Sequence, residues 1–169
     1  MELIDYTNKW LNGEIYEDIA LVIAGVVFLI LSILAWRFGK SESAHAIIIP
    51  LLIAALLLIG LGAGLGINNY NRKAQFQKQY QESPQQFLES EKERVEDFMK
   101  MYPQTIVVAT VMMGVGILAF SLCSKSILRA SALVLILVAF SALTIDFFSK
   151  ERGIIYQNEL NNIQIEEKI

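Results

Sequence analysis

The sequence predicts an all-α integral membrane protein, a four-helix bundle of two antiparallel hairpins with a helical extramembrane connection between the second and third spans. Three observations carry this prediction. The 169 residues are 54% hydrophobic and only 18% charged, whereas a soluble domain holds about 25% charged residues. Almost all of the charge falls outside four long apolar stretches, and the links between these stretches are short, long and short. We expect a single membrane domain over residues 1–169.

Four stretches are long enough to cross a bilayer, whose hydrocarbon core of about 30 Å needs about 20 apolar residues in a helix. The predicted spans are residues 19–36, 46–67, 105–122 and 130–148. Asp146, near the end of the fourth span, is the one ionisable residue within them, and such a residue is by default a candidate functional charge. Lys150 lies four positions further on, so we favour an interfacial carboxylate paired with this lysine over a functional charge.

The distribution of charge predicts which way the bundle faces. Residues 37–45 and 123–129 are the two short links, so both hairpin turns lie on the same side of the membrane. These turns carry four basic residues and one acidic residue, and the rest of the chain is net acidic. Because basic residues near span ends favour the cytoplasmic face, we expect cytoplasmic turns, with both termini and the long connection outside the cytoplasm.

The long connection, residues 68–104, is predicted to be helical and extramembrane. Its first part, residues 68–81, contains neither Pro nor Gly, so the second span can continue into water as a helix. Ser83 and Gln86 then match a capping box around Pro84 at the first helical position, which predicts the start of a new helix. Pro103 is expected to mark the turn back into the membrane.

The segments outside the membrane carry apolar stripes. In the connection, apolar residues recur at intervals of three, four and seven positions, as in an amphipathic helix: Leu88, Val95, Phe98, Met99 and Tyr102. The C-terminal tail, residues 149–169, is also amphipathic, and the N-terminal segment repeats the pattern up to an expected stop at Asn12-Gly13. We expect residues 84–101 to pack as a cap over the bundle. For the two tails, packing in the cap and lying flat among the lipid headgroups both remain open.

Small residues in two spans have the spacing of close helix contacts. They are Gly60, Gly62, Gly64 and Gly66 in the second span, and Thr110, Gly114 and Gly116 in the third. Small residues four positions apart let helix backbones approach each other closely in a membrane. We therefore predict that Gly62 and Gly64 contact a neighbouring span, with the third span as the favoured neighbour. A homodimer seam is the alternative.

The residue types that most catalytic and cofactor sites need are scarce. The single cysteine, Cys123, excludes disulfides within the chain and thiolate zinc sites, and the single histidine, His45, excludes sites with several imidazoles. The middle of each span lacks the charges that ion-coupled transporters use. We expect no enzyme activity, catalytic residue, cofactor or metal. The net charge of −3 gives no reason to expect nucleic acid.

One run of sequence resembles a group of bacterial proteins. Residues 36–42 (WRFGKSE), followed by Ile48-Ile49-Pro50, are similar to segments of small, uncharacterised bacterial inner-membrane proteins with two helical hairpins and a helical connection. The resemblance implies the same layout and a bacterial inner membrane. It implies no activity.

These features predict a non-enzymatic inner-membrane protein that acts through protein contact, as an accessory subunit, a regulator or an immunity-type protein. Its expected partners are the lipid bilayer and another membrane or periplasmic protein. The predicted contact residues, unless the cap consumes them, are Leu88, Val95, Phe98 and Tyr102. The alternative is a homo-oligomeric channel, or a protein that handles lipids or small molecules passively, built by packing of the glycine faces.

Overall fold

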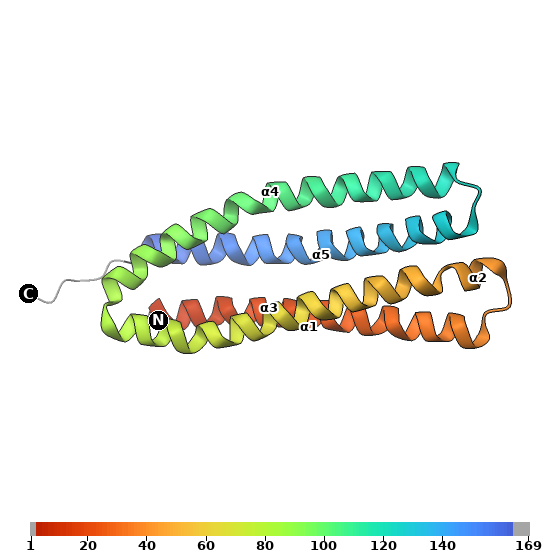
Figure 1. Ribbon diagram of the computed structural model, residues 1–169. Coiled ribbons are helices and arrows are strands. Elements are labelled where there is room, and N and C mark those ends of the chain that lie inside the picture. Colours follow the sequence, from red (N-terminus) through yellow and green to blue (C-terminus); the bar gives the residue numbers. More distant parts are fainter. Residues whose placement is uncertain (1–2, 164–169) are drawn as a thin grey trace, which may run out of the picture.

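The computed structural model describes residues 3–163, which form four long helices and one short helix (Figure 1). The elements are α1 (Leu3–Phe38), α2 (Glu42–Ala46), α3 (Ile48–Glu82), α4 (Pro84–Leu122) and α5 (Ser126–Asn162). No strand occurs within residues 3–163. The predicted all-α four-helix bundle is confirmed. By the length and hydropathy of its four long helices, the chain is a multi-pass membrane protein.

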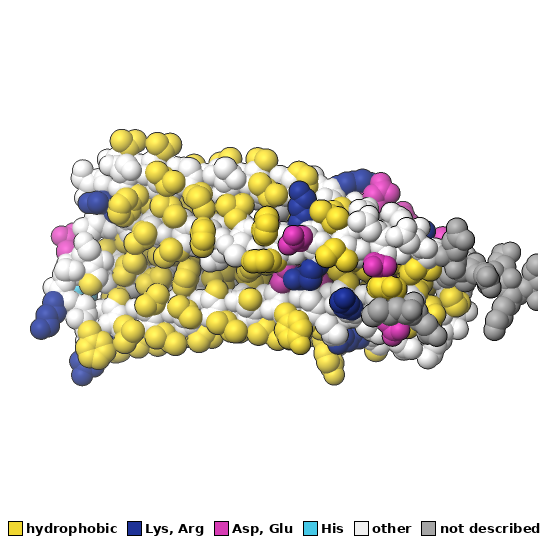
Figure 2. Space-filling model, turned by 180° about the vertical axis from the view of Figure 1, so that it is seen from behind, with side chains coloured by type: hydrophobic (Ala, Val, Ile, Leu, Met, Phe, Trp, Pro, Cys, Tyr) yellow, Lys and Arg dark blue, Asp and Glu magenta, His cyan; other side chains and the backbone are white. Residues whose placement is uncertain are grey.

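The long helices form two antiparallel pairs, as predicted. α1 packs along α3, and α4 packs along α5. Both hairpin turns lie at one end of the bundle, opposite the α3–α4 turn (Figure 1). Apolar side chains form a broad band between the hairpin turns and the opposite end, where charged side chains gather (Figure 2). Many large apolar side chains of this band are exposed, as expected for a surface that faces lipid.

The helices extend well beyond the apolar stretches at the end opposite the hairpin turns. α1 has 36 residues, which at 1.5 Å per residue gives about 54 Å, against a hydrocarbon core of about 30 Å. The surplus of all four helices, residues 3–18, 68–104 and 149–162, packs together, and we call this part the cap. The predicted C-terminal tail also includes residues 164–169, which lie outside the described residues.

Two predicted interruptions are wrong, because α1 continues through Asn12-Gly13 and α4 continues through Pro103. Gly weakens an isolated helix, but Gly13 lies against the Arg152 side chain, where a β-carbon would come within 2.5 Å of Nε. Pro103 removes one backbone donor, and α4 curves where its cap part meets its membrane part (Figure 1). The neighbouring Tyr102 is buried. Packing against other helices thus keeps both helices continuous.

Ser83 alone separates α3 from α4. Its Oγ accepts a hydrogen bond from the backbone N–H of Gln86 (3.4 Å), and Pro84 takes the first helical position, as predicted. The N–H of Ser83 donates to the carbonyl oxygen of Gln79 (3.0 Å). In a complete capping box, the Gln86 side chain would accept a hydrogen bond from the Ser83 N–H. Here that N–H already donates to the last turn of α3, so the capping box is incomplete. One residue both ends α3 and starts α4.

The cap has its own aromatic and aliphatic core. All four long helices contribute to it, through Leu3, Ile4, Trp10, Leu11, Phe76, Phe87, Leu88, Val95, Tyr156 and Leu160. Tyr102 is buried further along α4, and Phe98 packs against the core. The predicted packing of residues 84–101 as a cap is confirmed, and both tails join it. The partner surface at Leu88, Val95, Phe98 and Tyr102 was expected only if the cap left it free, and the cap buries Leu88, Val95 and Tyr102 and partly buries Phe98.

The glycines of α3 do not contact the third span. A β-carbon at Gly62 would lie 2.6 Å from the carbonyl oxygen of Asp18, so Gly62 faces α1, and Gly66 faces Asp18 as well. A β-carbon at Gly60 or Gly64 would meet no other described atom within 4 Å. Gly62 thus contacts a neighbouring span as predicted, but this span is α1 and not the favoured third span, and for Gly64 the prediction is wrong. The close approach runs between α1 and α3, the two helices of the first hairpin.

The small residues of α4 divide in the same way. A β-carbon at Gly116 would lie 2.7 Å from the Ile136 side chain, so Gly116 packs closely against α5. Gly114 has no described neighbour within 4 Å of a β-carbon, and Thr110 is exposed. Gly62, Gly66 and Gly116 thus lie in contacts within a hairpin. The other small residues face outwards from the bundle.

Candidate functional site

Asp146, the predicted intramembrane charge, is partly buried on α5. Among residues 3–163 it forms no ion pair, so the expected pair with Lys150 is not present. Its charge acts on Tyr102, whose pKa is raised to about 12 chiefly by burial, with smaller contributions from Glu14, Glu17 and Asp146. Asp146 therefore lies near a group of acidic side chains at the boundary between the cap and the spans.

This boundary cluster is built around one arginine of α5. Arg152 forms ion pairs with two carboxylates of α1, Glu17 and Glu14, with 3.5 Å between Arg152 Nη2 and Glu14 Oε1. Ser149 Oγ donates to Glu14 Oε1 (3.3 Å), and Tyr102 Oη lies 2.7 Å from Ser149 Oγ. The cluster connects α1, α4 and α5, and so links the two hairpins where the cap meets the spans.

Burial controls the protonation of the two α1 carboxyls. Only 14% of the Glu17 side chain is exposed. Burial, together with the neighbouring Glu14 charge, raises the pKa of Glu17 to about 7, although the Arg152 charge acts in the opposite direction. Burial also raises the pKa of Glu14, again against Arg152. Two carboxyls thus compete for one guanidinium, and Glu17 titrates close to neutral pH.

We expect the cap to lose stability as the pH rises from about 5 to about 8. Between the ordinary pKa of Glu17, 4.5, and its folded value of about 7, the folded chain binds more protons than the unfolded chain. The free energy of unfolding therefore falls with rising pH in this range. Thermal unfolding in detergent at several pH values measures the dependence, and Glu17→Gln should flatten it. Glu82→Gln, an exposed position, is the control, and equal slopes for E17Q and E82Q would contradict the assignment.

A second polar network lies inside the cap core. Glu91 of α4 is 2% exposed and accepts two hydrogen bonds from Arg94, at 2.6 and 2.8 Å. Tyr156 Oη of α5 donates to Glu91 Oε2 (2.7 Å), and Thr7 Oγ1 of α1 lies 2.8 Å from Tyr156 Oη. Burial and the Glu91 charge raise the pKa of Tyr156, so its hydroxyl remains a donor. The network satisfies a buried carboxylate, as buried polar groups require.

Aromatic rings enclose Arg94 on its other sides. Its guanidinium carbon lies 4.4 Å from the ring centroid of Trp10, 5.3 Å from that of Phe76 and 5.6 Å from that of Phe98. Trp10 also stacks on Phe98 and Tyr156, with centroid separations of 5.4 and 5.3 Å. A desolvated cation–π contact contributes about 2 kcal/mol. These contacts hold the rings of Trp10 and Tyr156 in fixed positions.

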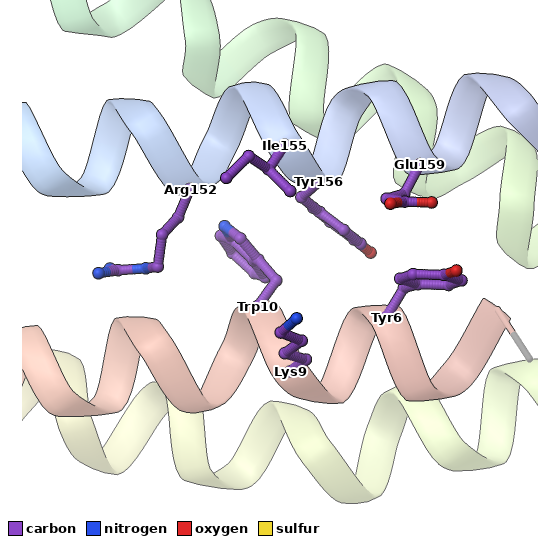
Figure 3. Close-up of a pocket in the computed structure, with 7 residues that line it drawn as sticks. All are labelled: Tyr6, Lys9, Trp10, Arg152, Ile155, Tyr156 and Glu159. Atoms are coloured by element: carbon purple, nitrogen blue, oxygen red, sulfur yellow. The ribbon is translucent and has the colours of Figure 1, made fainter. Parts of the chain in front are cut away.

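A groove between α1 and α5 opens beside these fixed rings (Figure 3). Its volume is about 120 Å³, and it is lined by Tyr6, Lys9, Trp10, Arg152, Ile155, Tyr156 and Glu159. Trp10 and Tyr156 are buried, whereas Ile155 is 58% exposed. Figure 3 shows Tyr6 beside Glu159 towards one end of the groove and Arg152 at the other. The groove thus combines an aromatic floor with charged side chains of both signs.

Five charged residues of the two networks are absent from the sequence-based site predictions: Glu14, Glu17, Glu91, Arg94 and Arg152. Each lies in a polar stretch, where a charge is usually solvated. The available signal was the i, i+3 spacing of Glu91 and Arg94, which places them on one side of a helix that also carries the apolar stripe. Pairing across helices, as for Arg152, leaves no such local signal.

No protein-family model, curated protein or solved structure matches the chain. Among residues 3–163, no group of three or more His, Cys, Asp or Glu side chains is placed to hold a metal ion. The candidate site therefore consists of the groove between α1 and α5 and the two networks that support it.

Proposed function

We propose that the chain is a non-enzymatic accessory, regulatory or immunity-type protein of a bacterial inner membrane, which binds another membrane or periplasmic protein through its cap. In this proposal the hairpin turns are cytoplasmic and the cap lies outside the cytoplasm, in keeping with the charge distribution. The observation that carries the proposal is the groove between α1 and α5, with its aromatic floor and charged ends.

The residue types that line the groove, and the fixed positions of their side chains, suit a protein partner. Trp, Tyr and Arg contribute most to protein–protein binding, and the groove contains one Trp, two Tyr and one Arg. Stacking fixes Trp10, and a hydrogen bond to Glu91 fixes Tyr156, so little side-chain entropy is lost on binding. The volume of about 120 Å³ is below the roughly 300 Å³ of small-molecule pockets. A groove of this size is better suited to a single side chain inserted by a partner protein.

Purification in mild detergent without cross-linker should retrieve a distinct partner in stoichiometric amount. Ile155→Asp should reduce the recovered partner about tenfold or more, since it places a charge on the exposed apolar rim of the groove. Tyr70→Asp is the matched control, because Tyr70 is 69% exposed on α3 and does not line the groove. Recovery of this chain alone, or equal recovery with I155D and Y70D, would count against the proposal.

The second candidate is a homo-oligomeric channel or a passive lipid-handling protein. The observation that favours it is the outward orientation of Gly60 and Gly64 on α3 and of Gly114 on α4, since small residues let helices of a second copy approach closely. Size measurement in detergent separates the two candidates. A monomer or dimer of this 19.0 kDa chain leaves no room for a central pore, whereas a larger ring would favour the channel.

A further inference from the structure

We propose that the hairpin-turn end of the bundle binds one phospholipid whose headgroup carries both a phosphate and a primary ammonium group, as in phosphatidylethanolamine. The site is a cavity of about 260 Å³ between the two hairpins, at the opposite end from the groove. Its polar lining comes from Ser43 within α2, from Ser124 after α4, and from Ser126 and Arg129 at the start of α5. Both hairpins are thus needed to form it.

The position of the cavity selects a lipid. Its serine residues lie in the turns that join the spans, where headgroups are found, and its apolar lining includes Ile47 and Leu133, which lie within the second and fourth spans. The lining therefore changes from hydroxyl to aliphatic along the direction of the bilayer normal. A glycerophospholipid has the same order, with a polar headgroup above apolar acyl chains. A soluble phosphate compound would match the upper part alone.

Arg129 provides the group that recognises phosphate. Its guanidinium carbon lies 4.9 Å from the ring centroid of Phe120, which also lines the cavity, and such a contact orients the guanidinium. Among residues 3–163, no carboxylate pairs with Arg129. Arginine can bind two phosphate oxygens at once through its planar fork of N–H donors. The hydroxyls of Ser43 and Ser124, which also line the cavity, can donate to the remaining oxygens.

Glu42 provides the group that selects the rest of the headgroup. It begins α2, and its Oε1 accepts a hydrogen bond from Ser126 Oγ (2.8 Å), which places a carboxylate at the edge of the cavity. This carboxylate favours a positively charged group in the part of the headgroup that lies beside it, even though the turns as a whole are net basic. A headgroup of both charges satisfies Arg129 and Glu42 together. A primary ammonium donates hydrogen bonds to a carboxylate, whereas the quaternary ammonium of phosphatidylcholine has no N–H to donate.

Native mass spectrometry of the full chain, titrated with phosphatidylethanolamine, phosphatidylcholine and phosphatidylglycerol of identical acyl chains, tests the proposal. We expect one phosphatidylethanolamine to be retained in preference to the other two lipids. Arg129→Gln should weaken its binding about tenfold. Lys40→Gln is the control for loss of a positive charge, since Lys40 is exposed at the same end and does not line the cavity. Glu42→Gln, at an exposed position, should abolish the discrimination between phosphatidylethanolamine and phosphatidylcholine.

Three outcomes would overturn the proposal. Equal retention of the three lipids would mean that the headgroup is not recognised. Equal losses with R129Q and K40Q would assign the effect to net charge. Binding of free phosphoethanolamine as tight as that of the lipid would show that the apolar wall has no role. Because Glu42 is exposed, E42Q keeps the test valid even if R129Q impairs folding.

Discussion

Replacing Arg94 with alanine is expected to lower the melting temperature of the chain by roughly 10 °C. The substitution leaves Glu91, whose side chain is 3% exposed, buried without its charged partner. Removing one member of a buried ion pair destabilises a protein by about 3–5 kcal/mol. For a chain of this size, each kcal/mol corresponds to roughly 2–4 °C. The contacts of the guanidinium with three aromatic rings are lost as well.

The fluorescence of Trp10 can report this transition, because the Arg94 guanidinium lies over its ring. The chain has two tryptophans, so Trp36→Phe leaves Trp10 as the one probe. Lys100→Ala is the matched control on the same helix. Lys100 pairs with Glu96, but both side chains are more than 60% exposed, and such pairs contribute at most about 1 kcal/mol. If R94A melts at the same temperature as K100A, the network does not stabilise the cap.

A second control separates the lost pair from the lost packing. The double variant Glu91→Leu, Arg94→Met replaces the pair by apolar side chains of similar size. Such replacements of buried ion pairs are often neutral or stabilising. The Tyr156 hydroxyl loses its Glu91 acceptor but keeps Thr7 Oγ1 at 2.8 Å. We therefore expect the double variant to recover most of the stability that R94A loses.

Gly62→Leu is expected to destabilise the chain by about 3 kcal/mol, whereas Gly64→Leu should have little effect on a monomer. A β-carbon at position 62 would lie 2.6 Å from the carbonyl oxygen of Asp18 and 2.9 Å from the β-carbon of Leu21. These atoms belong to or adjoin the α1 backbone, so α1 and α3 must separate. Overpacking of this kind commonly costs about 1–3 kcal/mol. At Gly64 a β-carbon meets no described atom within 4 Å.

The two positions form a matched pair, since both lie in α3 and both variants change glycine to leucine in the same span. Thermal unfolding in detergent, with insertion into membranes checked separately, gives the comparison. Equal melting temperatures for the two variants would contradict the assigned orientation of α3. A large loss in G64L together with dissociation of an oligomer would identify Gly64 as a contact with a second copy, and so favour the channel.

The spans, the two hairpins and the start of α4 could be predicted because their signals are local. Hydropathy over about 20 residues identifies a span, and Ser83 with Pro84 identifies a helix start from adjacent residues. The prediction that α1 ends at Asn12-Gly13 was wrong, because the low helix propensity of glycine is a local signal. It does not reveal that Arg152, far away in the sequence, packs against this turn of α1. Contacts between helices outweigh local preferences of this size.

The candidate site could not be predicted for the same physical reason. The i, i+4 spacing of Gly60, Gly62, Gly64 and Gly66 identifies two small faces of α3, and only the packing of α1 shows that Gly62 and Gly66 are covered. Likewise, the apolar stripe of α4 correctly indicates a buried face, but it equally suits a partner. A cap built from all four long helices decides between these possibilities, and its assembly depends on contacts between α1, α3, α4 and α5.

No loop separates the cap from the spans in the four long helices, so each of these helices can transmit a movement from one end to the other. Each of these helices passes from the cap into its apolar stretch without interruption, so a tilt imposed at one end is carried to the other. The groove is shared by α1 of the first hairpin and α5 of the second. We therefore expect a partner side chain inserted between them to increase the angle between the hairpins. The cavity near the turns is formed by both hairpins, so its width is expected to change as well, which would link binding at the proposed groove to binding at the proposed lipid site.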